Sequence, residues 1–284
     1  MTAVDSLRIQ RKNQPRAARR LRITPGLWLA WAVIALALVA ALFPHLFAHY
    51  DPYSGVAGTQ LTPPDGRHWL GTDQLGRDVF SRIIYGTRWS LSAAVAAVAV
   101  GLVVGAATGM LAAFSRLSVE NLVMRLVDVL LSIPALLLSL SIIILLGMGT
   151  FHAALAVGCA SVANFARLAR AEVLRIRRQD YIEAAFGSGG RFPAVFLRHV
   201  LPNALPTLLA FSALQFGQAI LALSTLSFLG FGSPPPVPEW GLMIAEGRNY
   251  LATAWWLSVF PGGVVIAVVL AANRISHYLS GDTL

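Results

Sequence analysis

Apolar residues occur in long stretches along this chain. Six such stretches follow one another, at 27–47, 91–114, 122–146, 151–166, 204–228 and 255–272. Most are close to the ~17 to 25 residues that an α-helix needs to cross the hydrocarbon core, where every backbone N–H and C=O must be paired within its own helix. The pattern predicts an all-α integral membrane protein with about six spanning helices.

Composition supports the membrane class. Hydrophobic residues make up 56% of the 284 positions and charged residues 12%, against roughly 25% charged residues in an ordinary soluble domain. The single cysteine, Cys159, lies inside an apolar stretch. The chain therefore offers neither a disulfide framework nor a cysteine metal site.

Basic residues set the expected orientation, because cytoplasmic loops of membrane proteins carry an excess of Lys and Arg. The N-terminal tail holds Arg8, Arg11, Lys12, Arg16, Arg19, Arg20 and Arg22 against Asp5, and segment 167–198 is similarly rich in arginine. Segment 44–88 balances its charges and segment 233–250 is net acidic. We expect both termini in the cytoplasm and the latter two segments outside.

Two other interpretations of the basic residues are rejected. The apolar core of a cleaved signal peptide has ~7 to 15 residues, fewer than stretch 27–47, and the Ala-His-Tyr sequence at 48–50 lacks a small-x-small cleavage pattern. Nucleic-acid binding does not fit, because the arginines lie beside apolar stretches and little soluble domain remains. Anionic lipid headgroups are the simpler partner.

Three regions are expected along the chain. They are a basic cytoplasmic tail at 1–25, a spanning helix with an extracytoplasmic loop at 26–88, and a transmembrane domain at 89–284. The first helix is expected to stand apart from a compact bundle of the others. Segment 71–78 predicts a turn and segment 79–88 a short interfacial helix. Gly101 and Gly105 have the G-x-x-x-G spacing that permits close helix contact.

The most informative polar segment lies in the longest predicted cytoplasmic loop, at about 167–203. Its notable residues are Glu183, Ala184, Ala185 and Gly189, followed by Arg198, His199, Leu201 and Pro202. The alanines allow close packing, Gly189 permits a backbone turn that a Cβ would resist, and Pro202 can start the next helix. Glu183 is expected to pair with a nearby arginine or to accept bonds from backbone amides.

This arrangement resembles the EAA loop of permease subunits in binding-protein-dependent ATP-binding-cassette (ABC) importers. In that family the loop forms two short cytoplasmic helices that meet at the glycine and sit in a cleft of the ATPase subunit. The resemblance implies that Glu183, Ala184, Ala185, Gly189, Arg198, His199, Leu201 and Pro202 couple this chain to an ATPase. It also implies a bacterial inner-membrane protein with the MetI-like fold of type I importers, in which an N-terminal helix precedes a core of about five helices.

Three further stretches are similar to the branch of that family that imports dipeptides, oligopeptides and nickel, and in particular to its C-type permeases. They are HWLGTDQLGRD at 68–78, RHVLPN at 198–203, and LSFLGFG at 226–232 with Trp-Gly at 240–241. The first contains an extracytoplasmic motif of Gly71, Thr72, Asp73, Gly76, Arg77 and Asp78. The resemblance implies a peptide cargo, with nickel or a metal chelate as the alternative.

ATP hydrolysis is expected on partner subunits. A P-loop holds phosphates with backbone amides and a lysine, and the only lysine is Lys12 in the basic tail. We expect no catalytic residue, no metal site and no bound cofactor in this chain, with ATP and Mg²⁺ on the partners. The implied partners are a second homologous permease, two ATP-binding subunits, an extracytoplasmic solute-binding protein and the lipid bilayer, without nucleic acid.

Isolated polar and aromatic residues have less specific interpretations. Asp128 lies in the third apolar stretch, where an ionisable residue is a functional candidate, but Arg125 one turn earlier favours an interfacial ion pair. His45 and His49, at i and i+4, leave open a metal site or a hydrated pair. An outer aromatic belt would accommodate Trp69, Trp240, Trp255 and Trp256.

Two other classes of function compete with the importer. A secondary transporter or channel would show buried charges along a path or inverted repeats with broken helices, and neither is evident in the sequence. A membrane scaffold without transport activity stays open. The sequence does not identify the residues that line a transport path.

Overall fold

The computed structural model describes residues 25–280, and every regular element in this range is helical. The arginine-rich tail, from which the orientation is inferred, lies outside the described residues apart from its end at Pro25. In chain order the elements are α2 (Pro25–Leu42), η1 (Pro44–Leu46), α3 (Val79–Val100), η2 (Gly101–Gly105), α4 (Ala106–Phe114), α5 (Leu117–Ser132), α6 (Ala135–Leu146), α7 (Thr150–Arg177), α8 (Asp180–Gly187), α9 (Phe192–Val195), η3 (Phe196–Val200), α10 (Leu201–Phe228), α11 (Trp240–Gly247), η4 (Arg248–Tyr250) and α12 (Trp256–Leu279).

Five helical segments of the described chain are long and apolar enough to cross a membrane. They are Pro25–Leu42, Val79–Phe114, Thr150–Arg177, Phe192–Phe228 and Trp256–Leu279. A bent pair, Leu117–Ser132 with Ala135–Leu146, brings the number to six if it forms one span. The predicted all-α membrane class, with about six spans, is therefore confirmed.

The third apolar stretch is not a straight helix. α5 and α6 meet at an angle of 94°. The cause is Pro134, which disfavours the helical conformation in the residue before it. Ile133 accordingly adopts an extended backbone with φ −86° and ψ 128°, which ends α5.

The interfacial helix predicted at 79–88 does not exist as a separate element. Asp78 caps the N-terminus of α3, its side chain accepting a 2.8 Å hydrogen bond from the backbone N–H of Ser81. From Val79 the helix runs through the π-helical turn η2 and α4 as one segment to Phe114. Its first turns are buried among other helices, with Val79 and Ile83 in an apolar cluster, so they have no face left for an interface.

The loop predicted at 167–203 is mostly helical as well. α7 continues past Ala166 to Arg177, and the next long helix already begins at Phe192. Pro202 lies in the first turn of α10, as predicted. The helical path does not begin there, however, because α9, with Pro193 in its own first turn, and the π-helical turn η3 lead directly into α10. Such turns accommodate the backbone groups that a proline leaves unpaired.

The glycine spacing in the second stretch does produce close helix packing. A Cβ at Gly101 would collide with the side-chain oxygen of Ser161 in α7, and one at Gly105 would collide with the carbonyl oxygen of Val162. Gly109, one turn further on, faces the carbonyl oxygen of Ala166 in the same way. The segment η2–α4 therefore lies directly on the backbone of α7.

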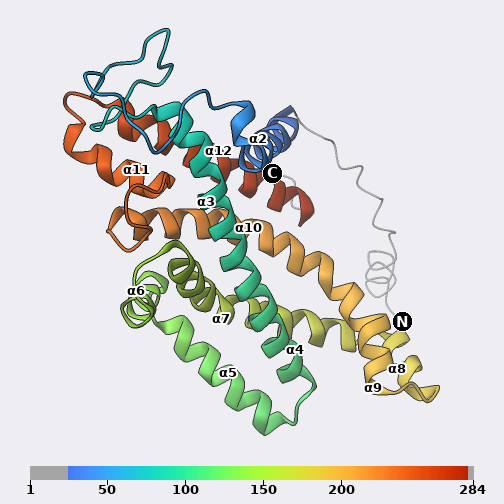
Figure 1. Ribbon diagram of the computed structural model, residues 1–284. Coiled ribbons are helices and arrows are strands. Elements are labelled where there is room, and N and C mark those ends of the chain that lie inside the picture. The colour runs from blue at the N-terminus through green and yellow to red at the C-terminus, as the bar shows by residue number, and fades with distance from the viewer. Residues whose placement is uncertain (1–24, 281–284) are drawn as a thin grey trace, which may run out of the picture.

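The N-terminal helix does not stand apart from the bundle. Leu27 and Ala30 of α2 form a buried cluster with Ala271 and Ile275 of α12. The start of α2 thus lies beside the end of α12, as Figure 1 also shows. The apolar side chains along α2 explain this contact, because a membrane helix gains van der Waals packing when it lies against a neighbouring helix.

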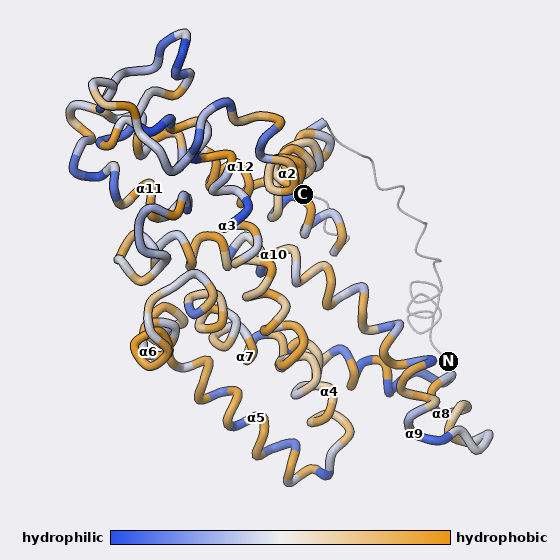
Figure 2. Tube along the Cα trace, viewed as in Figure 1, coloured by the Kyte–Doolittle hydropathy of each residue, from blue (hydrophilic) through white to orange (hydrophobic). Residues whose placement is uncertain are grey.

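The two polar regions of the sequence lie at opposite ends of the molecule. Figure 1 shows segment 48–78 and α11 at one end and α8 with α9 at the other. Figure 2 shows hydrophilic residues concentrated at these two ends, with hydrophobic residues along α2, α6 and the helices between. The segments 44–88 and 233–250, which were expected on one side of the membrane, do share one end.

Candidate functional site

The α8–α9 hairpin (residues 180–195) is built around two adjacent glycines. Gly189 has φ +88°, a left-handed conformation that favours glycine. The amide of Gly190 donates a 3.0 Å hydrogen bond to the carbonyl oxygen of Ala185, and that oxygen lies where a Cβ of residue 190 would have to be. Gly189 was predicted as the turn; Gly190 was missed, because the sequence does not reveal the close approach of Ala185.

Half of the residues predicted to contact an ATPase line one surface hollow beside the hairpin. A surface hollow of about 290 Å³ is lined by Ala185, Gly189, Arg198 and His199, together with Ser188, Gly190, Ala194 and Val195. The rings of Tyr181 and His199 meet edge to face with centroids 6.3 Å apart. Glu183 and Ala184 are exposed on α8, Leu201 is half-buried, and Pro202 is exposed on the following helix.

Glu183 has neither of the interactions expected for it. Within residues 25–280 its carboxylate makes no ion pair or hydrogen bond, and α8 begins without a side-chain cap. Arg175, near the end of α7, pairs with Glu172 at 2.5 Å and not with Glu183. The carboxylate of Glu183 is thus left exposed at the tip of the molecule.

The hairpin is firmly attached to the membrane helices behind it. Ile182 and Val195 are buried in one apolar cluster with Val173 and Ile176 of α7. Phe114, at the end of α4, contacts Phe192 and Phe196 edge to face, and the Arg177 guanidinium lies 4.8 Å above the Phe114 ring. A displacement of the hairpin would therefore be transmitted to α4 and α7.

Ion pairs connect α5 to the same part of α7. Asp128 does not pair with Arg125; it binds Arg167 at 2.5 Å, 39 residues later. Arg170 binds Glu120 at 2.6 Å one turn further along α7. Asp128 is in an ion pair, as predicted, but its partner comes from another helix.

The motif at 71–78 forms a compact polar turn at the other end of the molecule. The carboxylate of Asp73 accepts hydrogen bonds from the amides of Leu75 and Arg77 at 2.9 and 3.0 Å, and it binds the Arg77 side chain at 2.6 Å. Gly71 and Gly76 both have φ +75°. The turn is thus fixed by its own side chains and glycines.

Asp78 links this turn to its surroundings. One carboxylate oxygen lies 2.9 Å from Nδ1 of His68, and the other caps α3. The carbonyl oxygen of Thr72 accepts a 3.2 Å hydrogen bond from Nε1 of Trp256 at the start of α12. All six predicted residues of the motif therefore lie in one region, packed against α3 and α12.

Two charged residues missing from the predicted motif complete this region. Arg82 of α3 is 1% exposed and lies 3.5 Å from Asp73 and 3.3 Å from Glu246 of α11. Arg77 lies 3.6 Å from the same Glu246 carboxylate. Two arginines and two carboxylates thus neutralise one another and join the turn at 71–78 to α3 and α11. The ion pairs of Arg77 and Arg82 with Glu246 could not be predicted from the sequence, because Glu246 lies 164 residues beyond Arg82 along the chain.

Two of the four tryptophans assigned to an aromatic belt are buried instead. Trp240 is fully buried and donates a 3.2 Å hydrogen bond from Nε1 to the carbonyl oxygen of Ile83. Trp256 is likewise buried, against Thr72. Trp69 and Trp255 remain exposed, as a belt requires.

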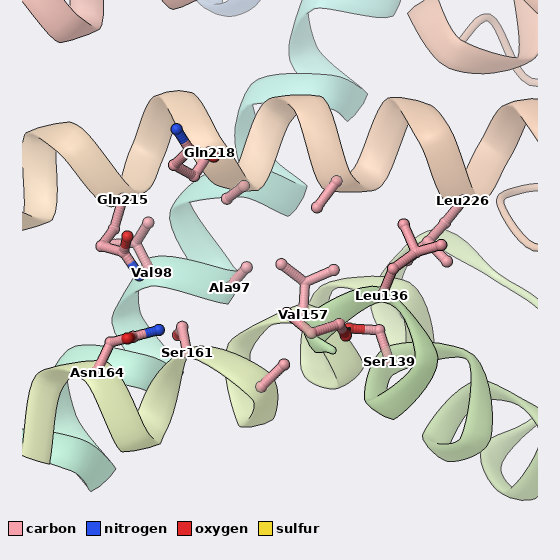
Figure 3. A pocket seen from close by; sticks show the side chains of 14 residues that line it. Ala97, Val98, Leu136, Ser139, Val157, Ser161, Asn164, Gln215, Gln218 and Leu226 are labelled. Carbon is pink, nitrogen blue, oxygen red and sulfur yellow. Dashed lines mark hydrogen bonds between the residues drawn. The ribbon is translucent and has the colours of Figure 1, made fainter. Parts of the chain in front are cut away.

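A cavity of about 270 Å³ lies between α3, α6, α7 and α10 and is open at the surface of the bundle, where Asn164 and Gln218 are exposed. Figure 3 shows Gln215 of α10 and Asn164 of α7 extending toward one another, with Ser161 beside Asn164, Ser139 on α6, and the amide of Gln218 pointing away from Gln215 and Asn164. Most of the remaining wall is aliphatic, including Ala97, Val157 and Leu226. No part of the sequence pattern identified these residues, because a single polar residue in an apolar stretch does not reveal which helix it faces.

Among residues 25–280, no three His, Cys, Asp or Glu side chains gather as metal ligands. The described chain has three notable polar features. They are the α8–α9 hairpin at one end, the cluster of Arg77, Arg82, Asp73 and Glu246 at the other end, and the cavity between them.

Comparison with known proteins agrees with this architecture. Residues 101–282 match the family described as the binding-protein-dependent transport system inner membrane component. The chain is 34% identical to the probable D,D-dipeptide transport system permease protein DdpC of Escherichia coli (strain K12), with 96% of this chain and 91% of that protein covered. It is 39% identical to the di/tripeptide transport system permease protein DppC of Pseudomonas aeruginosa, with 88% and 82% covered.

A third relative and a solved structure extend the comparison. The glutathione transport system permease protein GsiD of Pectobacterium atrosepticum is 38% identical, with 76% of this chain and 72% of that protein covered. A structure of the MetNI methionine ABC transporter in an inward-facing conformation has a TM-score of 0.56 at 18% identity, covering 70% of this chain and 96% of that one, which shows a common fold. The chain therefore belongs to the family of inner membrane components of binding-protein-dependent transport systems, as a multi-pass permease.

Proposed function

We propose that this chain forms half of the translocation path of an ABC importer for small peptides, and that its α8–α9 hairpin receives a separate ATPase subunit. The observation that carries the proposal is the hairpin itself. It presents Glu183, Gly189 and His199 at one end of the molecule, while Ile182 and Val195 fix it to α7. Because the hairpin is exposed at its end and packed against α7 at its start, a movement of a bound protein would be passed on to the membrane helices.

The peptide cargo is supported by relatives named for it. The names of the relatives from Escherichia coli and Pseudomonas aeruginosa specify dipeptides and di/tripeptides, and that of the relative from Pectobacterium atrosepticum specifies glutathione, itself a peptide. The nickel alternative is not favoured by these names. A transporter that needs no ATPase is disfavoured by membership of a family whose transport depends on binding proteins.

The remaining partners follow from the same proposal. A second permease would complete the path, two ATPase subunits with ATP and Mg²⁺ would seat on the two hairpins, and a solute-binding protein would deliver cargo to the end that carries segment 48–78. The hairpin end, with Arg175, Arg177 and Arg178 beside it, would face the cytoplasm. The start of α2 and the end of α12 lie together, so both termini would share the cytoplasmic side.

The test is purification of the complex through this chain, followed by reconstitution in liposomes. We expect a second permease and an ATPase to copurify, and uptake of radiolabelled dialanine to require ATP and the binding protein. Glu183→Lys reverses the charge at the exposed tip and Gly189→Pro is incompatible with φ +88°. Both variants should insert normally and lose ATP-dependent uptake.

Gly187→Ala is the matched control, since Gly187 has an ordinary helical backbone and open space at its Cβ position. It should transport as the unsubstituted protein does. Normal uptake by both Glu183→Lys and Gly189→Pro would refute the coupling role, and uptake without ATP would refute the whole proposal.

A further inference from the structure

The cavity between α3, α6, α7 and α10 is lined by three side-chain amides with no hydrogen-bond partner in the described chain. Within residues 25–280, the amide groups of Asn164, Gln215 and Gln218 make no hydrogen bond. The two serines of the wall differ, because Ser139 donates to the carbonyl oxygen of Ala135 at 2.9 Å and Ser161 to that of Gly158 at 2.7 Å. The polar capacity left open in this cavity therefore belongs to the amides alone.

These amides lie on the long apolar helices α7 and α10, away from the helix ends. Asn164 is at the middle of α7, which runs from Thr150 to Arg177. Gln218 precedes Phe228, the last residue of α10, by ten positions, which corresponds to about 15 Å along a helix axis. Asn164 and Gln218 are exposed and Gln215 is half-buried. In a membrane, an amide in such a place is costly to retain unless water or a ligand pairs with it.

The chemistry of the wall selects the kind of ligand. Among the residues of the described chain that line the cavity, none is charged. An amide side chain offers both N–H donors and a carbonyl acceptor, which are the groups needed to pair with the C=O and N–H of a peptide bond. A wall without charged residues has no net charge that would favour a peptide with an acidic side chain over one with a basic side chain.

The size of the cavity is also suitable. Its volume of about 270 Å³ is near the ~300 Å³ lower limit of small-molecule sites. Two of the helices that enclose it also support the hairpin, because Val173 of α7 and Leu208 of α10 lie in one buried cluster with Ile182 and Val195. The cavity therefore lies on elements that a moving hairpin would displace.

We propose that Asn164, Gln215 and Gln218 form a cargo-contact site that pairs with the peptide backbone of small peptides and is indifferent to the charge of their side chains. This inference rests on the proposed function as a peptide importer. It assigns to three named residues a contact during passage, distinct from the selection made by a binding protein.

The first test removes the amides in the complete reconstituted importer. Gln215→Met, Gln218→Met and Asn164→Leu keep side-chain volume and remove the polar groups. Each should lower the maximal uptake rate of dialanine about five- to tenfold, the effect of one or two lost hydrogen bonds. The loss should be equal for Ala-Lys and Ala-Glu.

Thr225→Val is the matched control, since it also removes a polar group from α10 but one that bonds within its own helix, to the carbonyl oxygen of Leu221. Its uptake should equal that of the unsubstituted importer. Gln218→Asn, which keeps an amide, should retain more uptake than Gln218→Met. Equal loss in Gln218→Asn and Gln218→Met would indicate a structural role and overturn the proposal, as would unchanged uptake in the three variants without amides.

The second test probes occupancy without relying on transport rates. The only cysteine is Cys159, so Cys159→Ala combined with Gln218→Cys yields a single thiol in the cavity. A small water-soluble thiol reagent should modify it, and peptide-loaded binding protein should slow that reaction at least fivefold. Leu221→Cys, at an exposed position of α10 outside the cavity, should show no protection.

Absence of protection at position 218 would overturn the site. Failure of the unsubstituted importer to take up any dipeptide would overturn both this site and the proposed function. Uptake by the unsubstituted importer together with unchanged variants would overturn the site and leave the proposed function intact.

Discussion

Arg82 and Glu246, 164 residues apart in sequence, meet with Nη2 and Oε2 at 3.3 Å. The arginine is 1% exposed and the glutamate side chain 18% exposed. The pair joins the first turn of α3 to α11. It thereby connects the region around the turn at 71–78 to α11 in the second half of the chain.

Removing one member of this pair should be costly. Arg82→Met leaves Asp73 and Glu246 close together with one compensating charge fewer, and breaking a buried ion pair costs about 3 to 5 kcal/mol. We expect the free energy of unfolding to fall by about 3 kcal/mol, measured by denaturant unfolding of the purified protein in detergent.

The double variant Arg82→Met with Glu246→Met serves as the comparison. Since it removes both charges, it should be more stable than the sum of the single variants implies. Additive losses would show that the two side chains do not interact.

The pairing of Asp128 with Arg167 can be tested against the alternative within α5. Both side chains are more than half exposed, at 60% and 57%, so the pair should contribute at most about 1 kcal/mol. A charge swap, Asp128→Arg with Arg167→Asp, should restore the unfolding midpoint that either single reversal lowers. Arg125→Gln should leave the midpoint unchanged; a loss equal to that of the Arg167 variant would instead favour the pair within α5.

The buried carboxylate of Glu239 is expected to make the stability of the protein depend on pH. Its carboxylate is buried at the start of α11, where it accepts hydrogen bonds from Ser227 and from the amide of Ser233. Burial raises the pKa of Glu239 above its usual value of 4.5, although both hydrogen bonds oppose the shift. The folded protein therefore holds this proton more tightly than the unfolded chain does.

The sign follows from that difference. The stabilising contribution of protonated Glu239 is complete below about pH 4.5 and is lost as pH rises through the raised folded value. Glu239→Gln should remove this part of the pH dependence of Tm. Asp65→Asn is a contrasting control: backbone amides of His68 and Arg67 lower the pKa of Asp65, so its contribution is lost on acidification instead. A Glu239→Gln profile identical in slope to that of the unsubstituted protein would contradict the assignment.

Hydrophobic pattern and spacing were sufficient to predict the class, the span count and the helix contact at Gly101 and Gly105. Their success has a local cause. The length of an apolar stretch is set by bilayer thickness, and a glycine pair on one helix face permits a close approach whatever the partner is. The positions of Gly189 and Asp73 in tight turns were predictable for the same reason.

The failures concern partners distant in sequence. Asp128 and Arg125 are close along the chain, yet the partner is Arg167; Trp256 matched a membrane belt, yet it bonds to Thr72. Nothing local distinguishes these outcomes, since both depend on which helices lie side by side. The predicted loop at 167–203 was too long for another reason: the last turns of α7 are as arginine-rich as a loop, and a short helix with a π-helical turn precedes Pro202 at the start of α10.

Gly190 offers the sharpest test of the hairpin geometry. A methyl group at residue 190 would overlap the carbonyl oxygen of Ala185, and such overpacking costs about 1 to 3 kcal/mol. Gly190→Ala should therefore open the turn, speed hydrogen exchange of the amides in residues 180–195, and reduce the stimulation of ATP hydrolysis by loaded binding protein.

Neighbouring glycines separate this steric effect from general changes in backbone freedom. Gly189→Ala meets open space but forces a left-handed residue, at a cost of about 1 to 2 kcal/mol. Gly187→Ala meets neither constraint and should stabilise α8 by up to about 1 kcal/mol. If exchange in Gly190→Ala is as slow as in Gly187→Ala, the carbonyl of Ala185 does not lie against residue 190, and the hairpin has a different turn.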